Sequence, residues 1–135
     1  MTNNPDAGLE ELSESECWRI LAEHEVGRLA VCILGKPDIF PVNYRIHKGT
    51  VLVRTAAGLK LAAATLGSAV AFEVDVFDET NHTGDSVVVR GPATEVERLG
   101  DLLDAKDAGV EPWAGGSRHR YVQIVPEQVT GRRIS

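Results

Sequence analysis

The chain has 135 residues and a formal net charge of −6. This length predicts one domain with one hydrophobic core and at most one active centre. The acidic balance and the scattered arginines argue against a general nucleic-acid binder, which would carry a basic face. The polar, acidic start of the sequence and the lack of a long apolar run predict a soluble, cytoplasmic protein that has no membrane partner.

We expect residues 1–12 to be a flexible tail and residues 13–135 to form the domain. Ser13 and Glu16 have the spacing of a capping box, which marks the start of a helix. Apolar side chains then recur at helical spacing, namely Leu12, Cys17, Ile20 and Leu21. The pattern predicts an amphipathic helix that ends at Gly27.

Three segments typical of strands follow, over residues 28–34, 39–47 and 50–55. The turns between them are the short stretches "GKPD" and "KG". Such short turns join antiparallel strands, because a parallel crossover needs a dozen or more residues. The sequence therefore predicts an antiparallel meander.

The second half of the chain alternates between helices and strands. We expect a short helix at about residues 59–66, a strand at 69–77, a strand at 86–97, a helix at 98–106 and a last strand at 120–134. Gly91 and Pro92 should mark a bulge or bend in their strand. Because so few helices cannot cover both faces of a sheet, we expect the sheet to close on itself as a small, mainly β, closed or split barrel.

The stretch "VRTAAGLK" is the first candidate for a binding site. Lys60 begins a predicted helix, where its charge opposes the helix dipole unless an anion binds there. Arg54 can offer a two-pronged guanidinium contact and Thr55 a hydroxyl donor to a phosphate, while Gly58 lets the backbone come close. The alternative is that Arg54 and Lys60 pair with acidic neighbours on a solvated surface. The stretch is not a P-loop, and its residues alone leave both possibilities open.

A family resemblance extends from about Ser13 to Ile134. It is carried by "PVNY", "RTAAGLK" and "VAFEVD" in that order, followed by "SVVVRG" and "TGRRI". In these motifs the chain resembles the pyridoxamine 5′-phosphate oxidase-like flavin-binding split barrels, and within them an actinobacterial, nitroimidazole-resistance-like branch. The resemblance implies a six-stranded antiparallel split β-barrel with short peripheral helices. It also implies a homodimer with two flavin mononucleotide (FMN) sites between the subunits.

The resemblance also implies roles for particular residues. Arg54, Thr55 and Lys60 match the positions that grip the 5′-phosphate of the flavin. Pro41, Val42 and Asn43 match the strand that runs along the isoalloxazine ring. The Asn43 amide is a candidate donor to the ring, because asparagine is uncommon in strands unless it has a partner; the alternative is an outward strand residue without a ligand.

Two further positions bear on this site. Trp113 lies between a proline and paired glycines, and we expect it either to close over the cofactor or to pack its loop onto the barrel. Members of the family often have Gly-Trp-Ser before the "VVVRG" strand, where this chain has Gly84, Asp85 and Ser86. An aspartate there removes an aromatic face and adds negative charge near the cleft, so we expect weaker flavin binding or a different substrate choice.

The remaining reactive side chains show no catalytic pattern. Cys17 and Cys32 are too far apart for a metal or redox motif, and we expect both to be buried free thiols. The four histidines are not spaced as zinc ligands, so no metal site is predicted. The sequence identifies no catalytic residue.

The sequence therefore predicts an FMN-binding oxidoreductase that acts on an unidentified small substrate. One alternative is a non-catalytic carrier of flavin, deazaflavin coenzyme or haem, with His47 as a candidate haem ligand. Another is a deazaflavin-dependent reductase. An oxidase of pyridoxamine phosphate itself is less favoured, because the chain is short and has no second basic cluster for the phosphate of that substrate.

Overall fold

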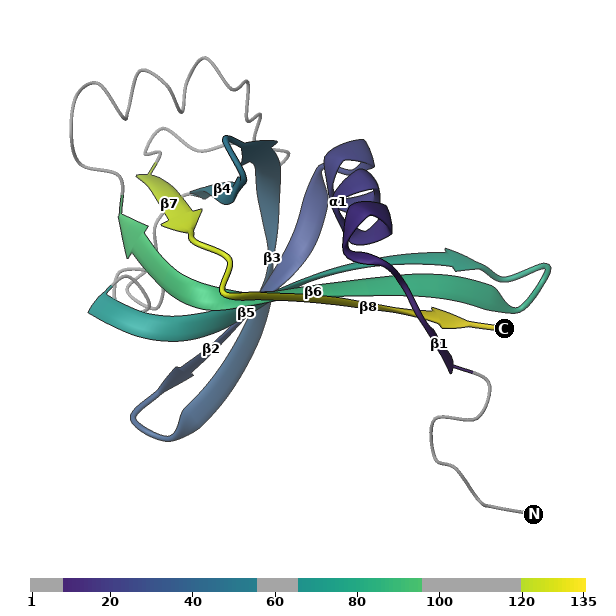
Figure 1. Cartoon of the computed structure of the whole chain (residues 1–135). Coiled ribbons are helices and arrows are strands. Elements are labelled where there is room, and N and C mark those ends of the chain that lie inside the picture. Colours follow the sequence, from purple (N-terminus) through teal and green to yellow (C-terminus); the bar gives the residue numbers. More distant parts are fainter. Residues whose placement is uncertain (1–8, 56–65, 96–119) are drawn as a thin grey trace.

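The computed structural model describes residues 9–55, 66–95 and 120–135 (Figure 1). These residues form one helix and eight strands: β1 (Leu9–Glu11), α1 (Glu14–Glu23), β2 (Val26–Ile33), β3 (Lys36–His47), β4 (Thr50–Thr55), β5 (Leu66–Asp78), β6 (Thr83–Glu95), β7 (Arg120–Ile124) and β8 (Gln128–Ile134). Most of the predicted second helix and all of the predicted third lie outside the described residues. So do Gly58, Lys60 and Trp113.

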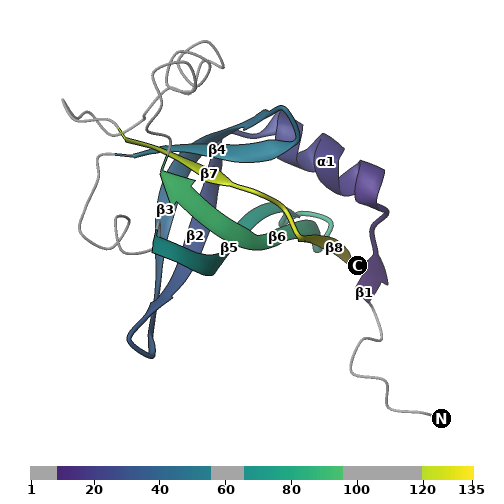
Figure 2. The ribbon, with the colours of Figure 1, turned by 60° about the vertical axis from the view of Figure 1, so that its left-hand side comes forward.

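Six of the strands close into an antiparallel barrel (Figure 2). The meander β2–β3–β4 is joined by β7 on one side and β5 on the other, and β6 pairs with both β5 and β7. The predicted meander and the predicted six-stranded split barrel are both confirmed. The β2–β3 turn is Leu34–Gly35, two residues at positive φ, so β3 begins earlier than expected, at Lys36.

β6 extends beyond the barrel and pairs with both of the last two strands, β7 and β8. Its second half pairs with β7 and its first half with β8, so the predicted last strand is two strands. The break lies at Val125–Glu127, where the Val125 amide donates to Pro92 O and the Glu127 amide to Arg90 O. A β-carbon on Gly91 would overlap the carbonyl oxygen of Val125, so only glycine admits this close approach. An irregularity also lies beside Pro92 in the pairing of β5 with β6: the register is regular from Pro92 to Thr83 and shifts between Leu66 and Ala69 of β5.

The N-terminal helix α1 begins as predicted and ends earlier than predicted. The Ser13 hydroxyl oxygen accepts from the Glu16 amide at 3.2 Å and the helix ends at Glu23, so the capping box is confirmed and the expected end at Gly27 is wrong. Gly27 lies in β2, where a β-carbon would overlap the ring of Phe72. Ahead of the helix, Leu9–Glu11 of the expected tail pairs with β8 as strand β1. Within the described ranges, no helix combines the length and the apolar character needed to cross a bilayer.

Tyr44 and Phe72 form the centre of the core. Both are fully buried, and their rings meet edge to face with centroids 4.7 Å apart. The Tyr44 hydroxyl donates to the Leu21 carbonyl at 2.6 Å, which ties α1 to the barrel. Burial also raises the pKa of Tyr44, so the phenol stays protonated and keeps donating.

Tyr44→Phe tests this link between α1 and the barrel. We expect it to lower the free energy of unfolding by about 1 to 2 kcal/mol, because the substitution removes one buried hydrogen bond and leaves the Leu21 carbonyl with one partner fewer. Urea denaturation followed by circular dichroism measures the loss. A variant as stable as the wild-type protein would show that this bond does not stabilise the docking of α1.

The two thiols differ in environment. Cys17 of α1 is buried, and its burial raises the pKa of the thiol, as expected for an inert core cysteine. Cys32 is exposed, so the prediction that both thiols are buried is wrong for this residue. The reason is strand alternation: Leu29 and Val31 of β2 point into the barrel, so Cys32 lies on its outer face.

Candidate cofactor site

The strand register brings the predicted ring strand next to the predicted phosphate residues. Asn43 of β3 lies directly opposite Arg54 of β4, and Thr55 is the next residue of that strand. Directly opposite residues of antiparallel strands have α-carbons about 4.5–5.5 Å apart. The two groups of candidate residues come from separate stretches of the sequence, and the register places them at the same end of the barrel.

The side chains of the ring strand divide between the two faces of β3. Val42 is buried in the core together with Tyr44, so a ligand outside the barrel can meet only the backbone of Val42. Pro41 is exposed and Asn43 is half-buried, and both lie on the outer face by strand alternation. Pro41 therefore presents a flat apolar surface to the outside, and Asn43 presents an amide.

Two cations near this end were not singled out from the sequence. Arg28 of β2 lies opposite Pro41, and Arg120 of β7 lies opposite Thr55. Both assignments depend on the register between strands that are distant in sequence, so no local pattern in the chain pointed to them. With Arg54, the register thus places three arginines on β2, β4 and β7 next to or opposite the candidate residues.

Glu73 of β5 is the acidic neighbour of this cluster. It lies opposite Arg28 on the outer face. Partial burial is the main cause that raises the pKa of Glu73, and the nearby carboxylate of Asp75 raises it further. Arg28 opposes the shift. The ionised carboxylate is therefore less favourable in the folded protein than in the unfolded chain.

Glu73→Gln should raise the melting temperature at pH 7. The stability contributed by a carboxyl with a raised pKa is fully present below its unfolded pKa and is lost as pH rises through the folded pKa. The advantage of the variant should therefore shrink as the pH falls towards about 4, the unfolded pKa of a glutamate. Because Glu73 is only partly buried, the gain should stay below about 1 kcal/mol.

Thermal unfolding at several pH values measures this effect. Glu79→Gln, in the exposed β5–β6 turn, is the matched control and should change little at any pH. Equal shifts in both variants, or a gain for Glu73→Gln that does not depend on pH, would contradict the assignment.

His47 lies four residues beyond Asn43 on the same side of β3. Its Nε2 atom is buried and, within the described residues, has no hydrogen-bond partner. An iron ion binds histidine through an exposed ring nitrogen, so haem would reach this atom only after its surroundings move. Haem is therefore a weak fit here.

Asp85 lies in a charge network with α1 and β8. Its carboxylate accepts from Arg133 of β8 at 2.9 and 3.3 Å, and Arg133 also lies 3.6 Å from Glu16 of α1. Within one chain, the negative charge of Asp85 is thus paired with Arg133.

Comparison with known proteins identifies the class. The family model for pyridoxamine 5′-phosphate oxidase matches residues 13–133, and the chain belongs to this family. The chain is 37% identical over 129 residues to the uncharacterized protein Rv0080 of Mycobacterium tuberculosis, with 92% of this chain and 84% of that protein aligned.

Two solved structures extend the comparison. The FAD binding protein from Mycobacterium smegmatis is 38% identical, with a TM-score of 0.81 over 93% of this chain and 98% of that one. A FAD-binding protein from Mesorhizobium loti is 26% identical, with a TM-score of 0.80 over 94% of this chain and 97% of that one. The predicted family resemblance is confirmed.

Proposed function

We propose that the protein is a flavin-dependent oxidoreductase that acts on a small substrate. The observation that carries the proposal is the register of β3, β4 and β7, in which Asn43 is opposite Arg54 and Thr55 is opposite Arg120. This arrangement suits a ligand with a flat polar ring at one end and a phosphate at the other. Family membership and the FAD-binding relatives support it.

The phosphate end of the site would be built by Arg54, Thr55, Gly58 and Lys60. Charge-assisted contacts from an arginine and a lysine suit a phosphate, because such hydrogen bonds are roughly twice as strong as neutral ones. FMN and FAD both carry a phosphate at this position of the ribityl chain. These residues therefore predict a phosphorylated flavin, with FMN the form expected from the sequence and FAD the form named in the relatives.

The ring end would be built on the outer face of β3. Pro41 supplies an apolar surface for the ring, and the Asn43 amide can donate to a ring carbonyl. Arg28, opposite Pro41, would supply a positive charge that stabilises an anionic reduced flavin. When bound, the flavin itself supplies hydride or electron transfer, and the chain orients it and restricts water.

We further propose that the enzyme is a cytoplasmic homodimer with its flavin sites between the subunits. Its free thiols, Cys17 and Cys32, fit a reducing compartment. Trp113 would close over the cofactor from its loop. Bringing together the outer face of β3 and a second subunit would exclude water from the ring, which strengthens every electrostatic contact there.

The competing proposal is a carrier that holds a cofactor without turnover. A single titration series separates the two: purified protein is titrated with FMN, FAD, riboflavin, deazaflavin coenzyme and haem, followed by absorbance. Saturable binding of FMN or FAD at one per chain, followed by catalysed reoxidation of the reduced flavin by a substrate, supports the enzyme. Binding without turnover supports a carrier, and binding of deazaflavin coenzyme alone supports a deazaflavin-dependent reductase. A protein that binds none of the five contradicts both proposals.

A further inference from the structure

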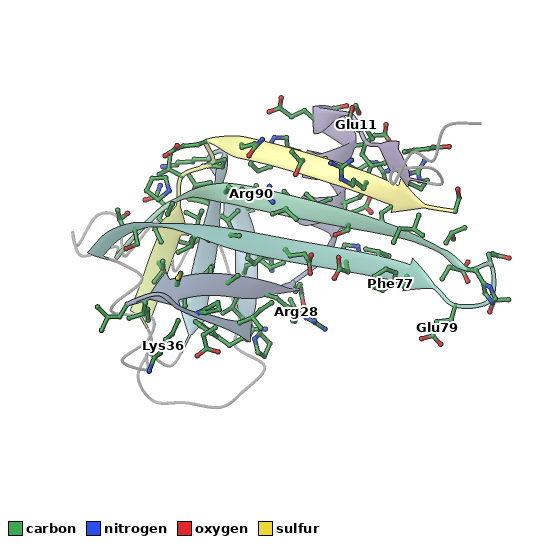
Figure 3. The ribbon with its side chains drawn as sticks, turned by 90° about the horizontal axis from the view of Figure 1, so that it is seen from below. Glu11, Arg28, Lys36, Phe77, Glu79 and Arg90 are labelled. Atoms are coloured by element: carbon green, nitrogen blue, oxygen red, sulfur yellow. The ribbon has the colours of Figure 1, made fainter. Side chains whose placement is uncertain are left out.

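Two carboxylates and one guanidinium lie together on the side of the sheet that faces away from α1. Glu73 and Asp75 are successive outward residues of β5, because Phe72 and Val74 of that strand are buried in the core. Arg28 of β2 lies directly opposite Glu73. Figure 3 views β8, β6, β5 and β2 from this side, with Arg28 labelled. We call these three residues, Arg28, Glu73 and Asp75, the charge cluster.

A serine and two more arginines surround the charge cluster. On β6, the Ser86 hydroxyl lies near the Glu73 carboxyl, and Arg90 is on the same face two residues beyond the position opposite Glu73. On β8, Arg132 lies opposite Ser86 and is one strand farther away. The helix α1 packs on the other side of the sheet, against β8, β6 and β3. Among the described residues, Arg28 is therefore the cation directly opposite Glu73.

The two carboxylates of the charge cluster share this one cation. Their α-carbons are two residues apart on one strand, about 7 Å, so each carboxylate makes the ionised form of the other less favourable. Partial burial and Asp75 raise the pKa of Glu73, and Arg28 opposes them. A further negative charge beside Arg28 would offset this opposition. Protonation of Glu73 would then become more favourable.

Arg28 connects the charge cluster to the ring end of the candidate cofactor site. It lies opposite Glu73 on one side and opposite Pro41 of β3 on the other. Glu73 and Pro41 are thus two strand spacings apart, about 10 Å. At an effective dielectric constant of about 20, two unit charges at about 10 Å change an equilibrium constant about tenfold. A charge that develops along β3 therefore affects the protonation of Glu73.

We propose that Glu73 takes up a proton when the flavin at the ring end is reduced, so that the reduction potential depends on the protonation of this residue. The inference rests on the proposed function, because it needs a flavin along β3. Glu73 is a positioning residue in this step: once protonated, it no longer competes for Arg28, which is left to pair with the reduced ring.

The step balances in electrons, protons and charge. A hydride donor of the reduced nicotinamide class gives two electrons and one proton to the ring, so that its C–H bond breaks and an N–H bond forms at N5. The donor is oxidised and the ring becomes an anion. A second proton comes from water and forms an O–H bond on the Glu73 carboxylate. The ring and the glutamate together carry one negative charge before and after the step.

Reduction potentials of the flavin-loaded protein test the proposal when they are measured from about pH 4 to about pH 8, where a glutamate with a raised pKa titrates. With pH, the wild-type potential should fall more steeply than that of Glu73→Gln, by up to about 30 mV per pH unit, which is one proton per two electrons. Protons taken up by the flavin itself are common to both proteins. The two curves should meet at low pH, where Glu73 is protonated in both redox states, and differ at high pH by about 30 mV, the tenfold effect.

Matched variants separate the chemistry of Glu73 from charge and structure. Glu79→Gln makes the same charge change in the exposed β5–β6 turn and should follow the wild-type curve. Glu73→Asp keeps a titrating carboxyl and should keep the steeper slope. Circular dichroism checks that each variant folds. If Glu73→Gln does not, Asp75→Asn replaces it and should move the point where the wild-type curve steepens to lower pH.

Nuclear magnetic resonance of the flavin-free protein gives a second measurement, the pKa of the Glu73 carboxyl. Asp75→Asn should lower this pKa and Arg28→Gln should raise it. A pKa that neither variant moves would overturn the proposal, since the charge cluster would then be uncoupled. Flavin binding with equal slopes in the wild-type protein and Glu73→Gln would overturn this inference and leave the proposed function in place. A protein that binds no flavin would overturn both.

Discussion

Lys60→Ala should weaken the binding of FMN and FAD by about ten- to a hundredfold and leave riboflavin binding nearly unchanged. The lysine is proposed to make one charge-assisted contact with the phosphate, and losing such a contact costs about 1.5–3 kcal/mol. Riboflavin has no phosphate and therefore has nothing to lose. Quenching of flavin fluorescence on titration measures all three affinities.

The control for this experiment is Lys36→Ala. Lys36 is exposed at the start of β3, so its loss changes the net charge equally and removes no proposed contact. Equal weakening of FMN and riboflavin by Lys60→Ala would show that the lysine does not bind the phosphate. Equal weakening of FMN by both lysine variants would point to the overall charge of the protein as the cause.

Phe72→Ala should lower the free energy of unfolding by about 3–5 kcal/mol, the usual loss for a large aromatic side chain in a core. The ring is fully buried, contacts Tyr44 edge to face and fills the space that Gly27 leaves open in β2. Removing it leaves a cavity between two sides of the barrel. Urea denaturation measures the loss, with the same m-value used for the variant and the wild-type protein.

Phe77→Ala on the same strand is the matched control. Phe77 is 61% exposed, so its removal should change the free energy of unfolding by about 0.5 kcal/mol or less. A loss for Phe72→Ala no larger than that for Phe77→Ala would contradict the placement of Phe72 at the centre of the core.

Part of the candidate site was readable from the chain because its motifs are local. The chemistry of "RTAAGLK" depends on neighbouring residues, and the family resemblance added Pro41 and Asn43. The sequence did not single out Arg28 and Arg120, because their positions depend on strand pairing. Arg28 pairs with Pro41, and Arg120 pairs with Thr55. Pairing between strands that are distant in sequence leaves no trace in either strand alone.

By itself, the sequence determined the family, the barrel and the elements that rest on short-range patterns. The Ser13 cap and the Lys48–Gly49 turn depend on residues within a few positions of each other, and both are found as expected. Only the tertiary structure decided which sides of those elements are buried and where strands end. The break at Val125–Glu127 exists because Gly91 admits it from another strand, and Cys32 is exposed because no described element covers its face. These features arise from packing between segments that are distant in sequence. The packing energy depends on both segments together, so the sequence of one segment does not predict it.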